Sequence, residues 1–234
     1  MTAGTLYLIP TFLSDDNFSV IPESVIQTVH TLHDFVVEEE KTARRFLKRI
    51  KSPIPQSEFV FQLLNEHSTG EELPAALNKL KSGTNIGLLS ESGCPAVADP
   101  GSDLVKLAHE HGIRVVPFVG PSSILLSLMG SGFNGQSFCF HGYLPRDPKQ
   151  RQQKIKELER ITIKSGQTQI FIETPYRNMQ LIDDLLQIMH DDSKLCIASE
   201  LTGQNENIRT KLIKNWKKNT PSFHKKPCIF LIGS

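Results

Sequence analysis

The sequence has few cysteines and no long apolar run. Its 234 residues include four cysteines, which lie far apart and form no CxxC pair. This spacing argues against a disulfide framework or a zinc knuckle, so we expect reduced thiols. No apolar stretch reaches the roughly 18 residues of a membrane-spanning helix, and the first residues lack the pattern of a secretory signal. We therefore expect a cytoplasmic protein without a membrane partner.

Several widespread site motifs are also missing. The first apolar run is not followed by GxGxxG, and GxxxxGK[ST] does not occur. The segment GPSS at 120–123 does not complete GxSxG. These absences argue against a dinucleotide-binding fingerprint, a P-loop and a hydrolase nucleophile elbow.

The charges are balanced in number but segregated along the chain. The formal net charge is +1, yet no acidic residue follows Glu206. The basic residues after it are Arg209, Lys211, Lys214, Lys217, Lys218, Lys225 and Lys226. A second basic stretch consists of Arg146, Lys149, Arg151 and Lys154. Two interpretations remain open, namely contacts with phosphate groups and ordinary solvated helix faces.

Apolar runs and helical segments alternate along the first half of the chain. The expected strands are 5–9, 34–38, 85–90 and 114–118. Helices are expected after Pro22, after a capping box from Thr69 to Glu72, and over 103–110. Such alternation is typical of a mostly parallel sheet covered by helices.

A second series of elements begins after the break at Gly120 and Pro121. The expected strands are 137–142, 168–173, 194–199 and 228–233, and the expected helices are 122–131, 149–164, 175–189 and 207–217. We therefore predict two α/β domains, 1–117 and 118–234, each with a mostly parallel sheet and flanking helices.

The segment SESGCPAVADPG at 90–101 follows an expected strand and precedes an expected helix. Two glycines and two prolines within twelve positions prevent regular structure there. Open α/β sheets bind their ligands in loops at the carboxyl ends of parallel strands. This loop is therefore the strongest candidate for a ligand site.

A series of eight motifs covers nearly the whole chain. The motifs are GTLYLIP, VEEEKTARRFL, NEHS, SESGCPAVADPGSDLV, VVPFVGPSSILLSL, FHGYLPR, IFIETPYR and ASELTG. In this order they resemble the ribosomal RNA small-subunit methyltransferase I family of the tetrapyrrole (corrin/porphyrin) methylase superfamily. The resemblance implies a two-domain fold that binds S-adenosyl-L-methionine in a cleft between the domains.

The resemblance also implies which residues contact the cofactor. In the first domain and the linker these are Pro10, Ser92, Gly93, Cys94, Val97, Ser122 and Ser123. In the second domain they are Glu173, Thr202, Pro227 and Cys228. Taken without the resemblance, Glu173 could simply pair with Arg177, and Thr202 and Ser122 or Ser123 could cap helices.

The implied reaction is methylation of ribosomal RNA in the small ribosomal subunit at a ribose 2'-hydroxyl, by a homodimer and without a metal. A sulfonium methyl is already activated, so alignment is the main task of the protein. Glu38, Glu39, Glu66 and His67 are candidate bases in the first domain, and no catalytic residue is assigned.

The loop at 10–22 differs from the family pattern. Members follow the first strand with a TPIGNLxDIT-like segment, and this chain has IPTFLSDDNFSVIP. Similarly, EDTRHT becomes EEEKTA and SDAGTP becomes SESGCP. Two alternative functions therefore remain open, namely a methylase of a tetrapyrrole or another small molecule, and a cofactor-binding protein without transferase activity.

Overall fold

The structure, a computed structural model, describes residues 2–64, 72–98 and 100–234. The chain divides into two compact units, Met1–Ser122 and Ser123–Ser234. Each unit has a five-stranded sheet with helices packed against it, which confirms the predicted α/β fold. The predicted boundary between residues 117 and 118 remains a prediction.

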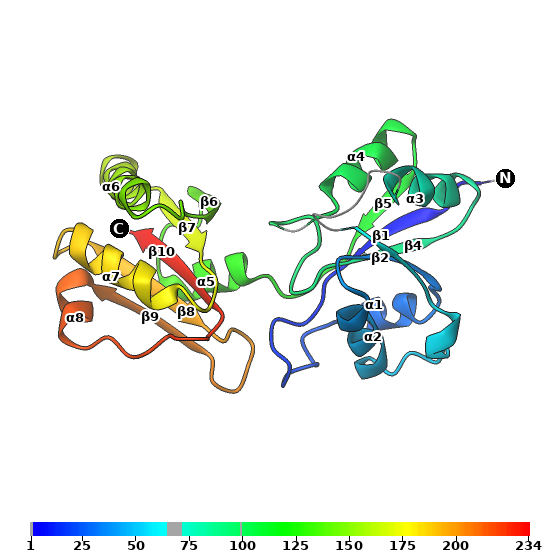
Figure 1. The fold of residues 1–234 in the computed structure, drawn as a ribbon, viewed down its shortest axis with the longest axis horizontal. Coiled ribbons are helices and arrows are strands. Elements are labelled where there is room, and N and C mark those ends of the chain that lie inside the picture. The colour runs from blue at the N-terminus through cyan, green and yellow to red at the C-terminus, as the bar shows by residue number, and fades with distance from the viewer. Residues whose placement is uncertain (1, 65–71, 99) are drawn as a thin grey trace. The chain divides into compact units, whose positions relative to one another are not determined.

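The sheet of the first unit is entirely parallel (Figure 1). Its strands are β1 (Thr5–Ile9), β2 (Asp34–Val37), β3 (Val60–Leu63), β4 (Ile86–Leu89) and β5 (Arg114–Pro117). Their order across the sheet is β3-β2-β4-β1-β5. The sequence predicts four of these strands and misses β3.

Helices cover both faces of this sheet (Figure 1). They are α1 (Glu23–Val29), α2 (Glu40–Arg49), α3 (Glu72–Lys81) and α4 (Ser102–Glu110), and a 3₁₀ turn, η1, spans Gln56–Glu58. Apolar residues of α1 and α2 pack on one face with Phe35 and Val37. Apolar residues of α3 and α4 pack on the other face with Leu6 and Leu88. The parallel sheet is therefore buried on both faces, as is usual for this class.

The sheet of the second unit is mixed. Its strands are β6 (Phe138–Tyr143), β7 (Thr168–Ile172), β8 (Lys194–Ser199), β9 (Asn207–Leu212) and β10 (Cys228–Gly233), in the order β6-β7-β10-β8-β9. Only the β6–β7 pair is parallel. The expectation of a mostly parallel sheet therefore holds for the first unit only. The short connection over 200–206 returns the chain as a hairpin, and β10 runs opposite to both of its neighbours.

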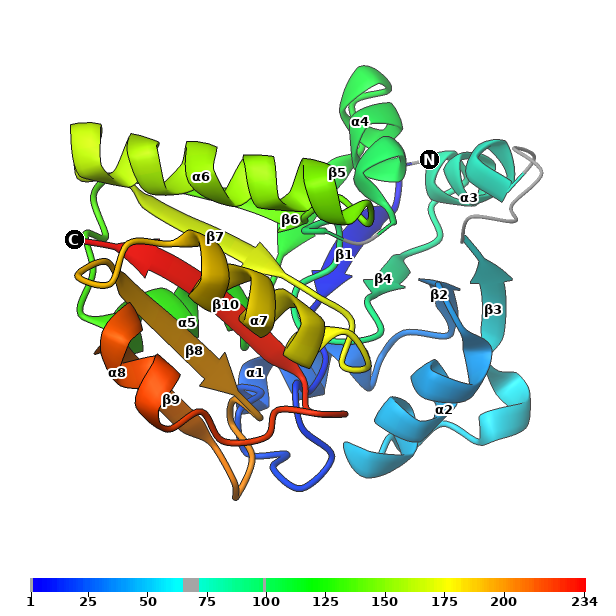
Figure 2. The ribbon, with the colours of Figure 1, turned by 60° about the vertical axis from the view of Figure 1, so that its left-hand side comes forward.

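Helices also cover both faces of the second sheet. They are α5 (Ser123–Ser131), α6 (Pro148–Ser165), α7 (Asn178–Ile188) and α8 (Ile213–Lys218). Apolar residues of α6, α7 and α8 pack together with Phe171 and Phe230 of the sheet. Figure 2 shows these three helices beside the strands of this sheet. The hydroxyl of Thr210 on β9 donates to the carbonyl of Ser131 at the end of α5, at 2.7 Å. Alternate residues of β9 therefore point to opposite faces of the sheet.

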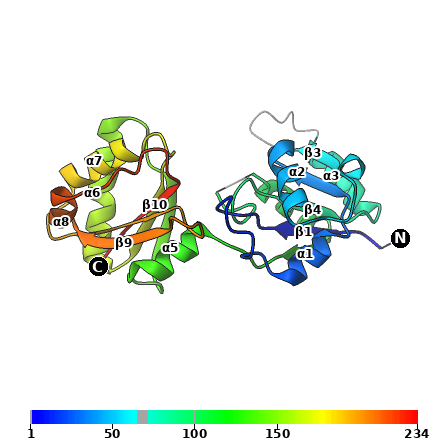
Figure 3. The same cartoon turned by 90° about the horizontal axis from the view of Figure 1, so that it is seen from below.

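The prediction of a helix over 207–217 is wrong in its first half. Residues 207–212 form β9, the edge strand of the second sheet, and only 213–218 are helical (Figure 3). Ile208 and Thr210 point toward α5 because strand residues alternate between faces. Among the described residues, no helix is long and apolar enough to cross a membrane.

Candidate functional site

The parallel strands of the first unit end together at one edge of the sheet. Ile9 of β1 and Val37 of β2 both pair with Leu89 of β4. The chain leaves β1 toward β2 on one side and leaves β4 toward β5 on the other. Adjacent strands whose connections diverge in this way form a topological switch point, where open α/β sheets bind ligands. Pro10 and Ser90 are the first residues beyond the two strand ends.

The loop after β4 is joined to the loop after β1 by hydrogen bonds. The backbone N–H of Thr11 donates to the carbonyl of Gly93 at 2.9 Å. The hydroxyl of Thr11 donates to the carbonyl of Ser90 at 3.1 Å, and that of Ser92 donates to Phe12 at 3.4 Å. These contacts bring Ser92 and Gly93 close to Pro10, as the predicted site requires.

The segment before Ser122 packs against the same two loops. A Cβ atom on Gly120 would lie 2.2 Å from Cγ of Pro10. The thiol of Cys94 donates to the carbonyl of Pro121 at 3.5 Å. Pro10, Cys94 and the residues just before Ser122 are thus neighbours, while Ser123 is the first residue of α5 in the second unit.

The loop over 90–101 has an unusual backbone. Ala96 and Ala98 both have a φ of 62°, and Gly93 and Gly101 have φ values of 80° and 116°. A positive φ costs a residue with a Cβ atom roughly 1–2 kcal/mol, and such strain is concentrated at functional sites. Val97, which lies between the two alanines, is 48% exposed. The loop therefore presents backbone groups and one apolar side chain outside any regular structure.

Three segments of the second unit that carry predicted site residues are tied together. The backbone N–H of Lys225 donates to the carbonyl of Pro175 at 3.0 Å. The backbone N–H of Glu200 donates to Pro227 at 3.0 Å, and Lys226 Nζ donates to Glu200 Oε2 at 2.6 Å. The segments around Glu173, Thr202 and Pro227 therefore form one group.

Glu173 and Thr202 both have specific partners. Glu173 is only 5% exposed, and its Oε1 accepts hydrogen bonds from Arg177 Nη2 at 2.5 Å and from the N–H of Thr174 at 2.7 Å. Thr202 has a φ of 67°, and its N–H donates to Glu206 Oε2 at 2.7 Å. The pairing of Glu173 with Arg177 is confirmed, and the roles of Glu173 and Thr202 in cofactor binding remain predictions.

Asn178 is a positioning residue that the sequence reading misses. Its buried Nδ2 donates to the carbonyl of Lys226 at 2.7 Å and to that of Phe223 at 3.2 Å. This side chain holds the segment that leads to Pro227 and Cys228. The available signal was an asparagine directly after IFIETPYR, but nothing in the sequence indicates its partners 45 and 48 positions away.

The cysteines have no disulfide partners. Burial, followed by repulsion from the Glu200 carboxylate, raises the pKa of Cys228 to about 12. Burial likewise raises the pKa of Cys196 to about 11. Both thiols are neutral near pH 7, so Cys228 offers an apolar contact surface and no thiolate nucleophile.

The candidate bases remain unassigned. Glu38 and Glu39 directly follow β2, at the same sheet edge as the loop after β4. Glu39 Oε2 accepts a hydrogen bond from the hydroxyl of Thr42 at 2.7 Å. Glu66 and His67 lie outside the described residues, as does Thr69 of the expected capping box.

The buried ion pair of Arg151 corrects the view of the stretch 146–154 as an exposed basic face. Arg151 is 2% exposed, and its Nη2 lies 2.5 Å from Asp184 Oδ2. Its Nη1 also donates to the carbonyl of Arg146 at 3.1 Å. Arg151 therefore stabilises the fold and is not available to phosphate.

Acidic residues from other segments neutralise part of the C-terminal basic stretch as well. Lys214 and Lys217 pair with Asp192 and Asp191, at 2.7 Å and 2.5 Å. The Lys214 ammonium lowers the pKa of Asp192 through a hydrogen bond and charge attraction. The segregation of charge along the sequence is therefore much weaker on the folded surface.

The comparisons with known proteins identify the family. No family model matches the chain. The ribosomal RNA small subunit methyltransferase I of Vibrio cholerae is 30% identical over 207 residues, which cover 88% of this chain and 68% of the relative. The chain belongs to the ribosomal RNA small subunit methyltransferase I family. A member from Haemophilus influenzae is 29% identical and covers 98% of this chain and 78% of its own length.

Two solved structures share the fold of this family member. The methyltransferase CobJ has a TM-score of 0.64 at 16% identity and covers 99% of this chain and 95% of its own. Diphthine synthase has a TM-score of 0.68 at 14% identity, and the match covers 99% of this chain and 90% of that structure's chain. Membership of the methyltransferase family makes this chain a methyltransferase, and its methyl donor is S-adenosylmethionine.

The backbone of the loop over 90–101 suits this cofactor. S-adenosylmethionine carries an amino group, a carboxylate, ribose hydroxyls and an adenine, all of which can bind backbone N–H and C=O groups. The glycine and positive-φ residues of loop 90–101 present such groups outside regular structure. Glycine at 93 also permits a close approach of the backbone to a ligand.

Proposed function

We propose that this methyltransferase methylates ribosomal RNA of the small subunit at a ribose 2'-hydroxyl, and that loops of both units bind the cofactor. The observation that carries this proposal is the relationship to enzymes named for that substrate, at 29–30% identity over 88–98% of this chain. Exposed arginines and lysines of the second unit, among them Arg146, Arg209 and Lys218, support an anionic substrate.

The chain's own residues would bind and orient the reactants. S-adenosylmethionine supplies, when bound, a methyl group on a positively charged sulfur. Pro10, Ser92, Gly93, Cys94 and Val97 would contact it from the first unit, and their loop is already held by hydrogen bonds. A loop held in place before binding loses little entropy on binding and keeps the reacting atoms aligned.

The remaining predicted cofactor residues would act from the linker and the second unit. They are Ser122, Ser123, Glu173, Thr202, Pro227 and Cys228. The neutral thiol of Cys228 and the ring of Pro227 suit the apolar faces of adenine and ribose. The acceptor hydroxyl must lose a proton during transfer, and a carboxylate at the end of β2 is placed at the right sheet edge to hold it.

A labelled-donor assay tests the proposal. Small ribosomal subunits from a strain that lacks this protein are incubated with it and with S-adenosylmethionine labelled in the methyl group. We expect label in the RNA and none when subunits already methylated by the wild-type strain are used. Absence of label from RNA would contradict the proposal.

Two other outcomes identify the alternatives. Transfer to a tetrapyrrole or another small acceptor, insensitive to salt, indicates a small-molecule methylase. Cofactor binding by calorimetry without transfer to any acceptor indicates a binding protein. We also propose a homodimer in the cytoplasm, and a light-scattering mass equal to that of one chain would contradict the dimer.

A further inference from the structure

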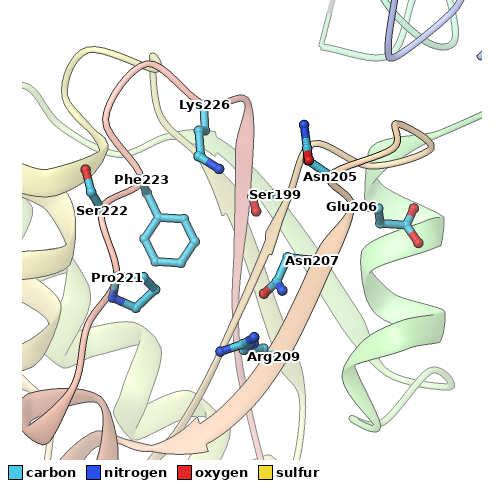
Figure 4. A pocket seen from close by; sticks show the side chains of 9 residues that line it. All are labelled: Ser199, Asn205, Glu206, Asn207, Arg209, Pro221, Ser222, Phe223 and Lys226. Atoms are coloured by element: carbon cyan, nitrogen blue, oxygen red, sulfur yellow. The ribbon is translucent and has the colours of Figure 1, made fainter. Parts of the chain in front are cut away.

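The second unit contains a polar pocket beside two of the predicted cofactor residues, Pro227 and Cys228. Its volume is about 400 Å³ (Figure 4). The lining residues are Ser199, Asn205, Glu206, Asn207, Arg209, Pro221, Ser222, Phe223 and Lys226. They come from the end of β8, the β8–β9 connection, the first half of β9 and the segment before β10. None of them is among the residues predicted to bind the cofactor.

The pocket lies on the sheet face opposite α5. Ser199 pairs with Asn207, and Ile197 pairs with Arg209. Ile197 belongs to the core formed with α6, α7 and α8, so Asn207 and Arg209 point to that face. Of the predicted cofactor residues, Ser123 begins α5 on the other face, whereas Cys228 pairs with Ser199 on the same face as the pocket.

Arg209 provides the available positive charge of the pocket. Its side chain is exposed and has no hydrogen bond or ion pair within the described residues. Lys226 is already paired with Glu200 at 2.6 Å. The Glu206 carboxylate accepts from the N–H of Thr202 and points away from Asn207 and Arg209 (Figure 4). The face occupied by Arg209 therefore has a net positive charge.

The other polar groups of the pocket suit an anion with several oxygens. Asn205 and Asn207 carry amide N–H groups, and Ser199 and Ser222 carry hydroxyls. A guanidinium presents five N–H donors in a planar arrangement that matches phosphate oxygens. Pro221 and Phe223 add an apolar wall beside these donors, which suits the sugar next to a phosphate.

We infer that this pocket binds a phosphodiester of the RNA substrate through Arg209. The inference rests on the proposed function, because it requires an RNA substrate. Such a contact holds the RNA equally in the ground state and in the transition state. It therefore lowers KM and leaves kcat nearly unchanged.

The test uses the full chain, labelled donor and unmethylated small ribosomal subunits. We expect Arg209→Gln to raise KM for the subunits about tenfold at low salt, with kcat within about twofold. For this variant, the slope of log(kcat/KM) against log salt concentration should be shallower by about 0.7, which is the value for one phosphate contact to single-stranded nucleic acid. Arg209→Lys should restore most of the slope, because the positive charge remains.

The matched control is Lys81→Gln. Lys81 is an exposed residue at the end of α3 in the first unit, outside the pocket, and the substitution removes the same charge. We expect less than a twofold change in KM. An equal effect of both substitutions would indicate general charge attraction and would overturn the inference.

The remaining outcomes separate this inference from the proposed function. If the wild-type chain methylates RNA and Arg209→Gln matches it in KM and salt dependence, the pocket proposal is wrong and the proposed function stands. A large loss of S-adenosylmethionine affinity in calorimetry would assign the pocket to the cofactor and also overturn the inference. If the wild-type chain methylates no RNA, both proposals fail.

Discussion

The first unit holds its candidate cofactor loops by close packing and neutral hydrogen bonds, whereas the second unit also uses a charged pair and a buried amide side chain. In the first, the loops after β1 and β4 are joined by the Thr11–Gly93 hydrogen bond and by the close approach of Gly120 to Pro10. In the second, Asn178 and the pair of Lys226 with Glu200 hold the corresponding segments. A buried ion pair, that of Arg151 with Asp184, also stabilises the second unit.

This difference determines which substitutions each unit tolerates. The close packing in the first unit fails when a Cβ atom is added where there is no room. The charged and amide contacts in the second unit fail when one partner is removed, because a buried polar group then loses its hydrogen bonds. The two units should therefore respond to different substitutions.

The largest expected effect is that of Asp184→Ala in the second unit. It leaves the buried Arg151 guanidinium without its carboxylate and removes the bond from Gln152. Loss of one partner of a buried ion pair costs about 3–5 kcal/mol of unfolding free energy. Urea unfolding followed by the fluorescence of Trp216, the only tryptophan, measures the second unit.

The neighbouring Asp183→Ala is the control for this substitution. Asp183 is exposed, so its replacement should change the unfolding free energy by less than about 0.5 kcal/mol. If both variants unfold at the same urea concentration, the buried pair does not stabilise the unit and the comparison fails.

A smaller effect is expected for Gly120→Ala in the first unit. The new Cβ would lie 2.2 Å from Cγ of Pro10, so the backbone of one loop must move. Overpacking of this kind costs about 1–3 kcal/mol. We expect calorimetry to show at least about a tenfold loss of S-adenosylmethionine affinity, with the Trp216 transition unchanged.

Gly135→Ala provides the matched glycine control, because a Cβ atom there meets nothing within 4 Å. It should leave cofactor affinity unchanged. A Trp216 transition that shifts in Gly120→Ala would show that the two units do not respond independently.

The smallest expected effect is a pH dependence confined to the second unit. Cys228 keeps its proton in the folded state up to about pH 12, whereas an unfolded thiol loses it near 9.0. The resulting stabilisation is complete below pH 9 and is lost as the pH rises toward 12. By pH 10 the loss is about 1 kcal/mol.

Cys228→Val isolates this contribution, since valine does not titrate. The difference in unfolding free energy between the wild-type chain and the variant should fall by about 1 kcal/mol from pH 8 to pH 10. Trp216 fluorescence in urea measures both proteins. A difference that does not vary with pH would contradict the role of the thiol.

Eight of the ten described strands were predictable from the sequence, because β-branched and apolar residues suit buried strands. Of the two that were missed, β3 is also rich in apolar residues. At the edge of the second sheet, β9 alternates Ile208 and Thr210 with Arg209 and Lys211, and its charges resemble an exposed helix. The pairing with β8 that makes it a strand depends on the fold as a whole.

Site positions were predictable where they depend on the local backbone. Loop 90–101 is indicated by its own glycines and prolines, and the structure places it at the switch point of the sheet. The burial of Arg151 was not predictable, because its partner Asp184 lies 33 positions away on another helix. Charge along a sequence does not reveal which charges meet after folding.

The position of β10 in the second sheet has a consequence for synthesis. This strand is formed by residues 228–233, yet it lies between β7 and β8 in the middle of the sheet. The first unit contains all of its strands by residue 117 and can fold while later residues are still being translated. The second unit must wait for its final strand, so a ribosome that stops before Cys228 would release a chain with a folded first unit and an open, aggregation-prone second one.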